Sequence, residues 1–70
     1  MQNYLTIFIN GNPFNCNSSM SLFDLLTYLE IEFDSTIVEY NHSIIDKDDF
    51  RLLYIKNNDS LEFMSVVGGG

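Results

Sequence analysis

Apolar and polar positions follow two different periods along this chain. Residues 4–9 read Tyr-Leu-Thr-Ile-Phe-Ile, a run rich in β-branched and aromatic side chains, and Asn10 and Gly11 follow it directly. Asn-Gly after such a run is a strong hairpin signal, so the pattern predicts a strand, a tight turn and a short returning strand at 13–16. Pro13 has no N–H to donate, which places it at the start or on the edge of that strand.

The apolar period lengthens after the hairpin. Four leucines are spaced i, i+3, i+4 and i+7, namely Leu22, Leu25, Leu26 and Leu29. This spacing puts them on one face of a helix, which we expect over residues 22–30 with its leucine face packed on a sheet. Ser21, followed three residues later by Asp24, is typical of a capping-box start.

Shorter segments separated by turn residues fill the second half of the chain. The pattern predicts a connection at 31–35, strands at 36–40, 44–45 and 61–67, turns at 41–43 and 57–60, and a polar helical turn at 46–50 anchored by Phe50. The sequence leaves residues 51–56 open between strand and loop. A hairpin, one helix and further strands indicate an α+β fold, with a mixed sheet of four to five strands and one main helix across one face. The short chain favours the β-grasp arrangement, in which the last strand lies parallel to the first in the middle of the sheet.

Composition limits the chain to one small domain. It has 70 residues, of which 46% are hydrophobic and 14% aromatic, enough to fold although the core of so short a chain is marginal. No apolar run approaches the roughly 18 residues of a spanning helix, and no signal peptide is visible, so we expect a soluble protein that is not secreted. Alanine and tryptophan are missing while asparagine, isoleucine and phenylalanine are plentiful. This skew is typical of AT-rich coding sequences, as in a plastid or some bacteria.

Acidic side chains dominate the charge. Ten acids face three basic residues, and the formal net charge is −7. This balance disfavours nucleic acid and anionic membranes as partners, because phosphates are bound by Lys and Arg. A basic protein surface is the natural counterpart, since complementary fields speed encounter. Acidity that only confers solubility is the alternative, and charge does not separate the two.

Side chains suited to catalysis are scarce. His42 is the only histidine and falls in a turn, and Cys16 falls in a strand without a basic neighbour, which favours a small buried apolar residue over a nucleophile. Asp46, Asp48 and Asp49 lack the ligand spacing of a calcium loop. One cysteine and one histidine form neither a disulfide nor a zinc cluster, and no phosphate-binding glycine loop is present. We therefore expect no catalytic residue, no metal and no bound cofactor.

The chemically distinctive segment is Val66-Val67-Gly68-Gly69-Gly70. Glycine has no Cβ and loses much entropy when ordered, so three glycines after an apolar strand do not serve packing. One interpretation is a frayed terminus. The other is a slender stalk that carries the α-carboxylate of Gly70 into a narrow channel of a partner, since three extended residues reach about 10 Å. A carboxylate must be activated before it reacts, so the ATP site is expected in that partner.

The interpretation of the glycines as a stalk divides the chain into a folded domain at 1–67 and a flexible glycine tail at 68–70. Phe63, Val66 and Val67 are candidate docking residues next to the tail. The alternative for these apolar side chains is ordinary sheet core, which strand alternation makes true of about half of them.

Motifs spread over nearly the whole chain resemble one known family. They are Ile9-Asn10-Gly11, then Ser21-Leu22-Phe23-Asp24-Leu25-Leu26, Val38-Glu39-Tyr40-Asn41, Asp59-Ser60-Leu61-Glu62 and Val66-Val67-Gly68-Gly69-Gly70. In this order they resemble ThiS, the small sulfur carriers of thiamine biosynthesis, whose fold is a ubiquitin-like β-grasp. Each internal motif is weak alone, and their order together with the three glycines is what carries the resemblance.

The resemblance implies a co-substrate and not an enzyme, working in a bacterial cytoplasm or a plastid stroma. An adenylating enzyme of the ThiF type would use ATP to activate the carboxylate of Gly70, with Gly68 and Gly69 as the stalk in its active site. Sulfur from a persulfide, supplied by a donor such as a cysteine desulfurase, would then give a terminal thiocarboxylate. Thiazole synthase (ThiG) would take this sulfur, with deoxyxylulose phosphate and a glycine imine, to build the thiazole.

Two other readings remain. The small subunit of molybdopterin synthase shares the fold, the Gly-Gly ending and the thiocarboxylate, but that family tends to be longer and to have Pro or Ala near its glycines. The valine pair before Gly68 and the 70-residue length point away from it. A ubiquitin-like modifier or a pure interaction module stays open.

Overall fold

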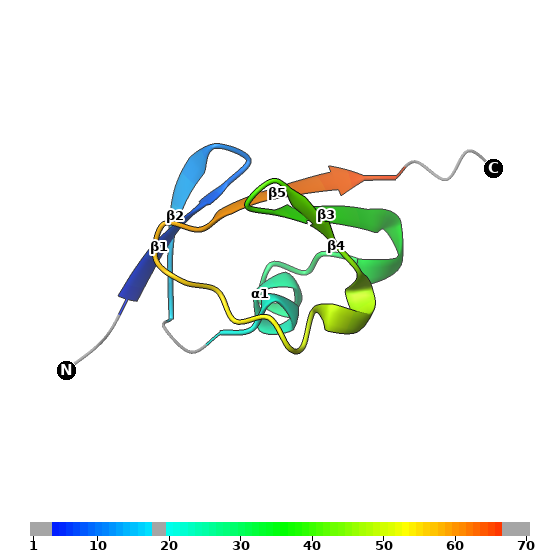
Figure 1. The fold of residues 1–70 in the computed structure, drawn as a ribbon, viewed down its shortest axis with the longest axis horizontal. Coiled ribbons are helices and arrows are strands. Elements are labelled where there is room, and N and C mark those ends of the chain that lie inside the picture. Colours follow the sequence, from blue (N-terminus) through cyan, green and yellow to red (C-terminus); the bar gives the residue numbers. More distant parts are fainter. Residues whose placement is uncertain (1–3, 18–19, 67–70) are drawn as a thin grey trace.

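A computed structural model of the chain describes residues 4–17 and 20–66 and arranges them in two layers, a sheet and one α-helix (Figure 1). The strands are β1 (Tyr4–Ile9), β2 (Asn12–Asn17), β3 (Thr36–Tyr40), β4 (Ser43–Ile45) and β5 (Ser60–Ser65). The helix α1 (Leu22–Tyr28) is accompanied by two 3-10 turns, η1 (Phe33–Ser35) and η2 (Lys47–Asp49). The strand order is β2-β1-β5-β3-β4, with β1 and β5 parallel and the other neighbours antiparallel. The predicted α+β β-grasp fold is thus confirmed, including a last strand in the middle of the sheet.

The β1–β2 hairpin has the turn that its sequence predicts. Asn10 and Gly11 have φ of 50° and 86°, and both positive values are what a two-residue hairpin turn with the right twist requires. Pairing therefore begins at once, at Ile9 opposite Asn12. For that reason β2 is one residue longer at each end than the predicted 13–16. Pro13 lies in this edge strand, as predicted.

The start of α1 combines a local cap with a distant one. Ser21 Oγ accepts the N–H of Asp24 at 3.0 Å, and Asp24 Oδ2 accepts the N–H of Ser21 at 3.3 Å, which confirms the capping box. The next two N–H groups, which no turn of the helix can satisfy, donate to backbone carbonyls of the segment after η2. These bonds are Leu22 to Leu53 at 2.8 Å and Phe23 to Phe50 at 3.0 Å.

The helix ends earlier than predicted, at Tyr28 instead of residue 30. Glu30 adopts φ of 59°, outside the helical range. Its N–H donates to the carbonyl of Thr27, and the N–H of Ile31 donates to the carbonyl of Leu26. This pair of bonds is a Schellman ending, which satisfies the last helical carbonyls and turns the chain toward η1.

The core lies between α1 and the facing side of the sheet. Nine residues form it: Ile7, Cys16, Leu22, Leu25, Leu26, Val38, Phe50, Ile55 and Leu61. Leu22, Leu25 and Leu26 are fully buried, while Leu29 is half-buried at the end of the helix. The leucine face therefore packs on the sheet, as its spacing predicts. Phe50 is buried behind η2 and anchors that turn, also as predicted.

Two strands in the second half have limits that differ from the prediction. The turn after β3 is two residues long, because Asn41 and His42 both have positive φ, and Ser43 already belongs to β4. β5 spans Ser60–Ser65 where residues 61–67 were predicted. Residues 51–56 form a loop whose one strand-like pairing is a bridge between Tyr54 and Ser21. Within the described ranges, no helix is long and apolar enough to cross a membrane.

Candidate functional site: the outer face of the sheet at the end of β5

Side chains of β5 alternate between two environments. Leu61 is fully buried and Phe63 packs against the core, so both face α1. Glu62 and Met64 point to the opposite side, the outer face, because successive side chains of a strand alternate. Of the three residues predicted to dock a partner, Phe63 thus lies on the core side. Val66 is 46% exposed.

The rest of the predicted site lies outside the described residues. These positions are Val67, Gly68, Gly69 and Gly70. What the structure does place is the backbone that leads to them. The N–H of Val66 donates to the carbonyl of Ser35 at 2.7 Å, one step beyond the last pair of the β3–β5 ladder. This bond extends the pairing of the two segments by one step, to Val66.

Exposed apolar side chains gather on the outer face near this point. We call them the outer patch: Ile37, Ile44, Met64 and Val66, which are 38%, 69%, 39% and 46% exposed. Ile37 lies directly opposite Met64 in the β3–β5 register. Ile37, Ile44 and Val66 also line one hollow. The outer patch is therefore continuous and reaches the last described residue before the tail.

Two acidic side chains adjoin the outer patch. Glu39 of β3 lies directly opposite Glu62 of β5, and Ile44 of β4 lies directly opposite Glu39 on its other side. Glu62 is exposed and Glu39 is half-buried. Like charges placed directly opposite each other in a sheet are destabilising, so this arrangement does not serve the isolated fold.

A hollow of about 510 Å³ lies at the sheet edge beside Val66. Phe33, Ile45 and Phe50 supply aromatic and aliphatic walls next to the outer patch. At its rim, Lys47 and Asp34 form an exposed ion pair. The hydrogen bond between the two raises the pKa of Lys47 and lowers that of Asp34. The hollow is thus lined mainly by apolar side chains, with the ion pair at its rim.

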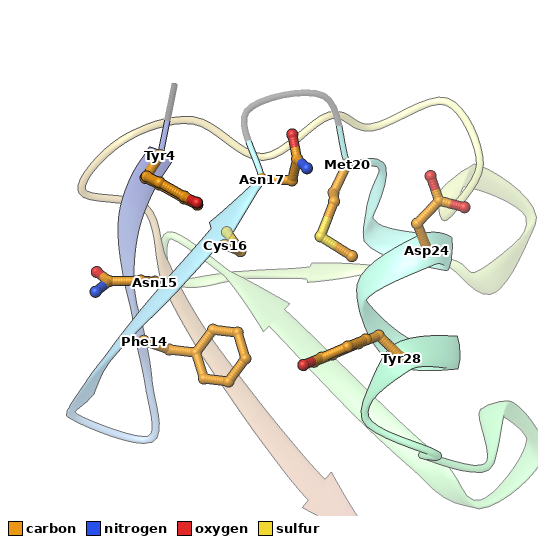
Figure 2. Close-up of a pocket in the computed structure, with 8 residues that line it drawn as sticks. All are labelled: Tyr4, Phe14, Asn15, Cys16, Asn17, Met20, Asp24 and Tyr28. Atoms are coloured by element: carbon orange, nitrogen blue, oxygen red, sulfur yellow. The ribbon is translucent and has the colours of Figure 1, made fainter. Parts of the chain in front are cut away.

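A second groove, of about 550 Å³, lies at the other sheet edge between β2 and α1 (Figure 2). Phe14 and Tyr28 meet edge-on across it, with ring centroids 6.5 Å apart, and Met20 points into it. Cys16 lies at its floor, buried in the core, and this burial raises the pKa of its thiol. The prediction that Cys16 is a buried residue is confirmed, and a raised pKa keeps the thiol in its less reactive protonated form.

Other polar candidates lie apart from one another. His42 is exposed in the β3–β4 turn, and the acids around η2 begin a 3-10 turn, with Asp46 as its N-cap. Among residues 4–17 and 20–66, no three His, Cys, Asp or Glu side chains are grouped so as to hold a metal ion. The chemically notable surface of the described part is therefore the outer face that leads to the tail.

Comparison with known proteins agrees with this geometry. The five-stranded sheet with one helix across it defines a ubiquitin-like β-grasp protein. The family model of ThiS matches residues 7–70, and the chain belongs to the ThiS family. The crystal structure of the thiamine biosynthesis protein ThiS from Geobacter metallireducens superposes with a TM-score of 0.83 at 26% identity, covering 94% of this chain and 100% of that one.

Curated relatives extend over nearly the same residues. The uncharacterized protein ycf40 of Porphyra purpurea is 38% identical over 66 residues, which are 94% of this chain and 93% of the relative. The ycf40 protein of Trieres chinensis is 37% identical over 65 residues, 93% and 89% of the two chains. A thiazole synthase of Paramagnetospirillum magneticum is 30% identical over 66 residues, but these are only 20% of that longer protein.

Proposed function

We propose that this chain is the sulfur carrier for thiazole formation in thiamine biosynthesis. Membership of the ThiS family and the likeness to a thiamine biosynthesis protein support the pathway. The observation that carries the proposal is the course of β5. This strand runs through the middle of the sheet. Val66, the residue after its end, donates to the carbonyl of Ser35 just before β3, and Val67 alone separates it from the three glycines in the sequence.

In the proposed reaction a carboxylate oxygen of Gly70 attacks the α-phosphorus of ATP in a ThiF-type partner. Pyrophosphate leaves, and the carboxyl carbon becomes an acyl-adenylate. The terminal sulfur of a cysteine persulfide, made by a donor such as a cysteine desulfurase, attacks that carbon and AMP leaves. A second thiol then reduces the acyl disulfide, which frees the thiocarboxylate and leaves a disulfide between the donor cysteine and that thiol.

This chain contributes position and not catalysis to these steps. Gly68 and Gly69 would form a stalk without side chains, which a narrow active-site channel requires. Val66 and Val67 would contact the partner where the stalk begins, while Phe63 would hold β5 on the core. The chain is thus proposed to be a protein co-substrate that binds no cofactor, with ATP held by its partner.

A thiazole synthase of the ThiG type is the proposed acceptor of the sulfur. The thiazole synthase of Paramagnetospirillum magneticum includes a segment similar to almost all of this chain, within a protein about five times as long. Joining a carrier to its acceptor raises the effective concentration of one for the other, which supports a working partnership between the two kinds of domain. The net charge of −7 supports protein partners over nucleic acid or membranes. We place the protein in a bacterial cytoplasm or a plastid stroma.

Pyrophosphate exchange tests the activation step. The wild-type chain, a Gly69→Val variant and a variant lacking Gly70 would each be incubated with ATP, labelled pyrophosphate and a ThiF-type enzyme. We expect exchange with the wild type and none with either variant, while all three melt at the same temperature. Loss of folding in the variants would make the glycines structural, and exchange that persists without Gly70 would exclude its carboxylate as the reacting group.

A further inference from the structure

The outer face is an exposed sheet surface that combines the outer patch with the Glu39–Glu62 pair. We propose that it docks on the adenylating partner, and that Glu39 and Glu62 together receive one Arg or Lys side chain of that partner. This inference rests on the proposed function. It adds which surface the partner contacts and which charge it recognises there.

Strand register brings the two carboxylates together on the same face. In the antiparallel β3–β5 ladder, Asn41 donates to Ser60 and Val66 donates to Ser35. Hydrogen-bonded pairs alternate with non-bonded pairs, so Glu39 and Glu62, which lie between those two, also form a bonded pair. Cα atoms of such a pair are about 5.5 Å apart, a spacing that lets one guanidinium or ammonium group contact both carboxylates.

Among residues 4–17 and 20–66, no cation forms an ion pair with Glu39 or Glu62. Within the described ranges the one ion pair joins Lys47 to Asp34. Arg51 stacks over the ring of Phe23 at 4.0 Å, on the helix layer. Two neighbouring negative charges without a counter-ion destabilise the sheet, and a cation from a bound partner would remove that repulsion. The partner's surface must therefore be basic at this point, which also agrees with the chain's net charge of −7.

Continuity with the tail limits the occupant to an enzyme that acts on Gly70, and we commit to the adenylating partner, which acts on it first in the proposed reaction. Glu62 and Met64 of β5 lie on the outer face, followed by the exposed Val66 just beyond the strand, and only Val67 separates Val66 from the tail in the sequence. Four residues of extended chain separate Glu62 from Val66 and span about 13 Å, so contacts at Glu62 hold Val66 at a fixed distance from the partner's basic group. Apolar contacts with Ile37 and Ile44, and the hollow beside them, would complete the docked surface. A second copy of this chain is a poor occupant, because it carries the same negative charge.

The charge part is tested with Glu39→Gln, Glu62→Gln and the double variant, against Glu30→Gln as control. Glu30 is exposed at the end of α1, in the other layer, and its replacement changes the net charge by as much as either single variant does. We would measure kcat and KM of pyrophosphate exchange with a ThiF-type enzyme that accepts the wild type, at low and high salt, and the melting temperature of each variant. We expect the double variant to raise KM about tenfold, with kcat unchanged and a weaker dependence on salt.

Melting separates a docking role from a structural one. Because the substitutions remove a repulsion, we expect the melting temperature to stay equal or rise, so that a more stable protein is a poorer substrate. A double variant with the KM of the wild type would overturn the inference. A higher KM together with a lower melting temperature would also overturn it, since the glutamates would then support the fold.

The apolar part is tested with Ile44→Ser against Leu52→Ser. These side chains are 69% and 76% exposed, and Leu52 lies in the segment between η2 and β5, away from the outer patch. We expect Ile44→Ser to raise KM and Leu52→Ser to leave it unchanged; equal effects would argue against docking on the outer face. If no ThiF-type enzyme adenylates even the wild type, the proposed function fails first, and this inference with it.

Discussion

Tyr40 donates its phenolic hydroxyl to a carboxylate oxygen of Asp59 over 2.5 Å, joining the end of β3 to the residue that precedes β5. Asp59 is only 7% exposed and accepts two further bonds, from Asn41 Nδ2 at 3.1 Å and from the N–H of Lys56 at 2.6 Å. Asn41 in turn accepts the N–H of Ser60 at 2.8 Å. This network fixes where β5 begins, and therefore the register that brings Glu62 opposite Glu39.

Removing the carboxylate of Asp59 should destabilise the domain. We expect Asp59→Ala to lower the free energy of unfolding by about 2–4 kcal/mol, because three donors lose a charged acceptor in a nearly buried place. Asp48→Ala, at an exposed acid of η2, is the control and should change it by less than about 0.5 kcal/mol. Urea unfolding would measure both. Equal stability of the two variants would show that the network is not needed for the fold.

Alkaline pH should weaken the same contact. Burial, together with the hydrogen bond and the negative charge of Asp59, raises the pKa of Tyr40 to about 12. An unfolded tyrosine titrates near pH 10, so the folded state favours the protonated phenol. The stabilisation is therefore complete below about pH 10 and is lost as the pH rises from about 10 to about 12. We therefore expect the melting temperature of the Tyr40→Phe variant to fall less than that of the wild type between about pH 10 and about pH 12. Equal falls in the two proteins would contradict this assignment.

The leucine face of α1 should dominate stability. Leu25 and Leu26 are fully buried, so we expect Leu25→Ala or Leu26→Ala to cost about 2–5 kcal/mol of unfolding free energy. A domain of this size has little more to lose, and either variant is expected to melt near or below room temperature. Leu52→Ala, at an exposed leucine, serves as the control. Melting like the wild type in both core variants would refute the packing of this face on the sheet.

Cys16 should be slow to react and dispensable. Its thiol is buried and its pKa is raised, so we expect slow labelling by a thiol reagent in the folded protein and fast labelling in urea. A Cys16→Ala variant should still be adenylated and accept sulfur. Loss of sulfur acceptance in a folded Cys16→Ala protein would mean that this thiol, and not only the tail, takes part in the transfer.

Most elements of the fold were predictable from residues that lie close together in the chain. The turn at Asn10 and Gly11 and the capping box of Ser21 depend on residues close together in the chain, and both were predicted correctly. The end of α1 was not, because Glu30 takes a conformation that glycine usually occupies in this motif. Strand limits also shifted, since pairing with a distant strand decides where a strand stops.

Long-range relationships were beyond the reach of the pattern. The sequence predicts only that Asp59 belongs to a turn. Nothing near it in the chain indicates that its carboxylate accepts three hydrogen bonds. Alternation along the last strand showed that about half of its apolar residues face the core, but not that Phe63 is among them. The opposition of Glu39 and Glu62 depends on the β3–β5 register, which only the assembled sheet defines.

The central claim is that sulfur is carried on the carboxyl group of Gly70. Intact mass spectrometry tests it most directly, after incubation with ATP, a ThiF-type enzyme, a cysteine desulfurase with cysteine, and a reducing thiol. We expect the wild-type mass to rise by the difference between one sulfur and one oxygen atom, and a variant without Gly70 to keep its mass. A wild-type chain that stays unchanged, or that becomes joined to another protein, while a known carrier is converted under the same conditions, would contradict the account.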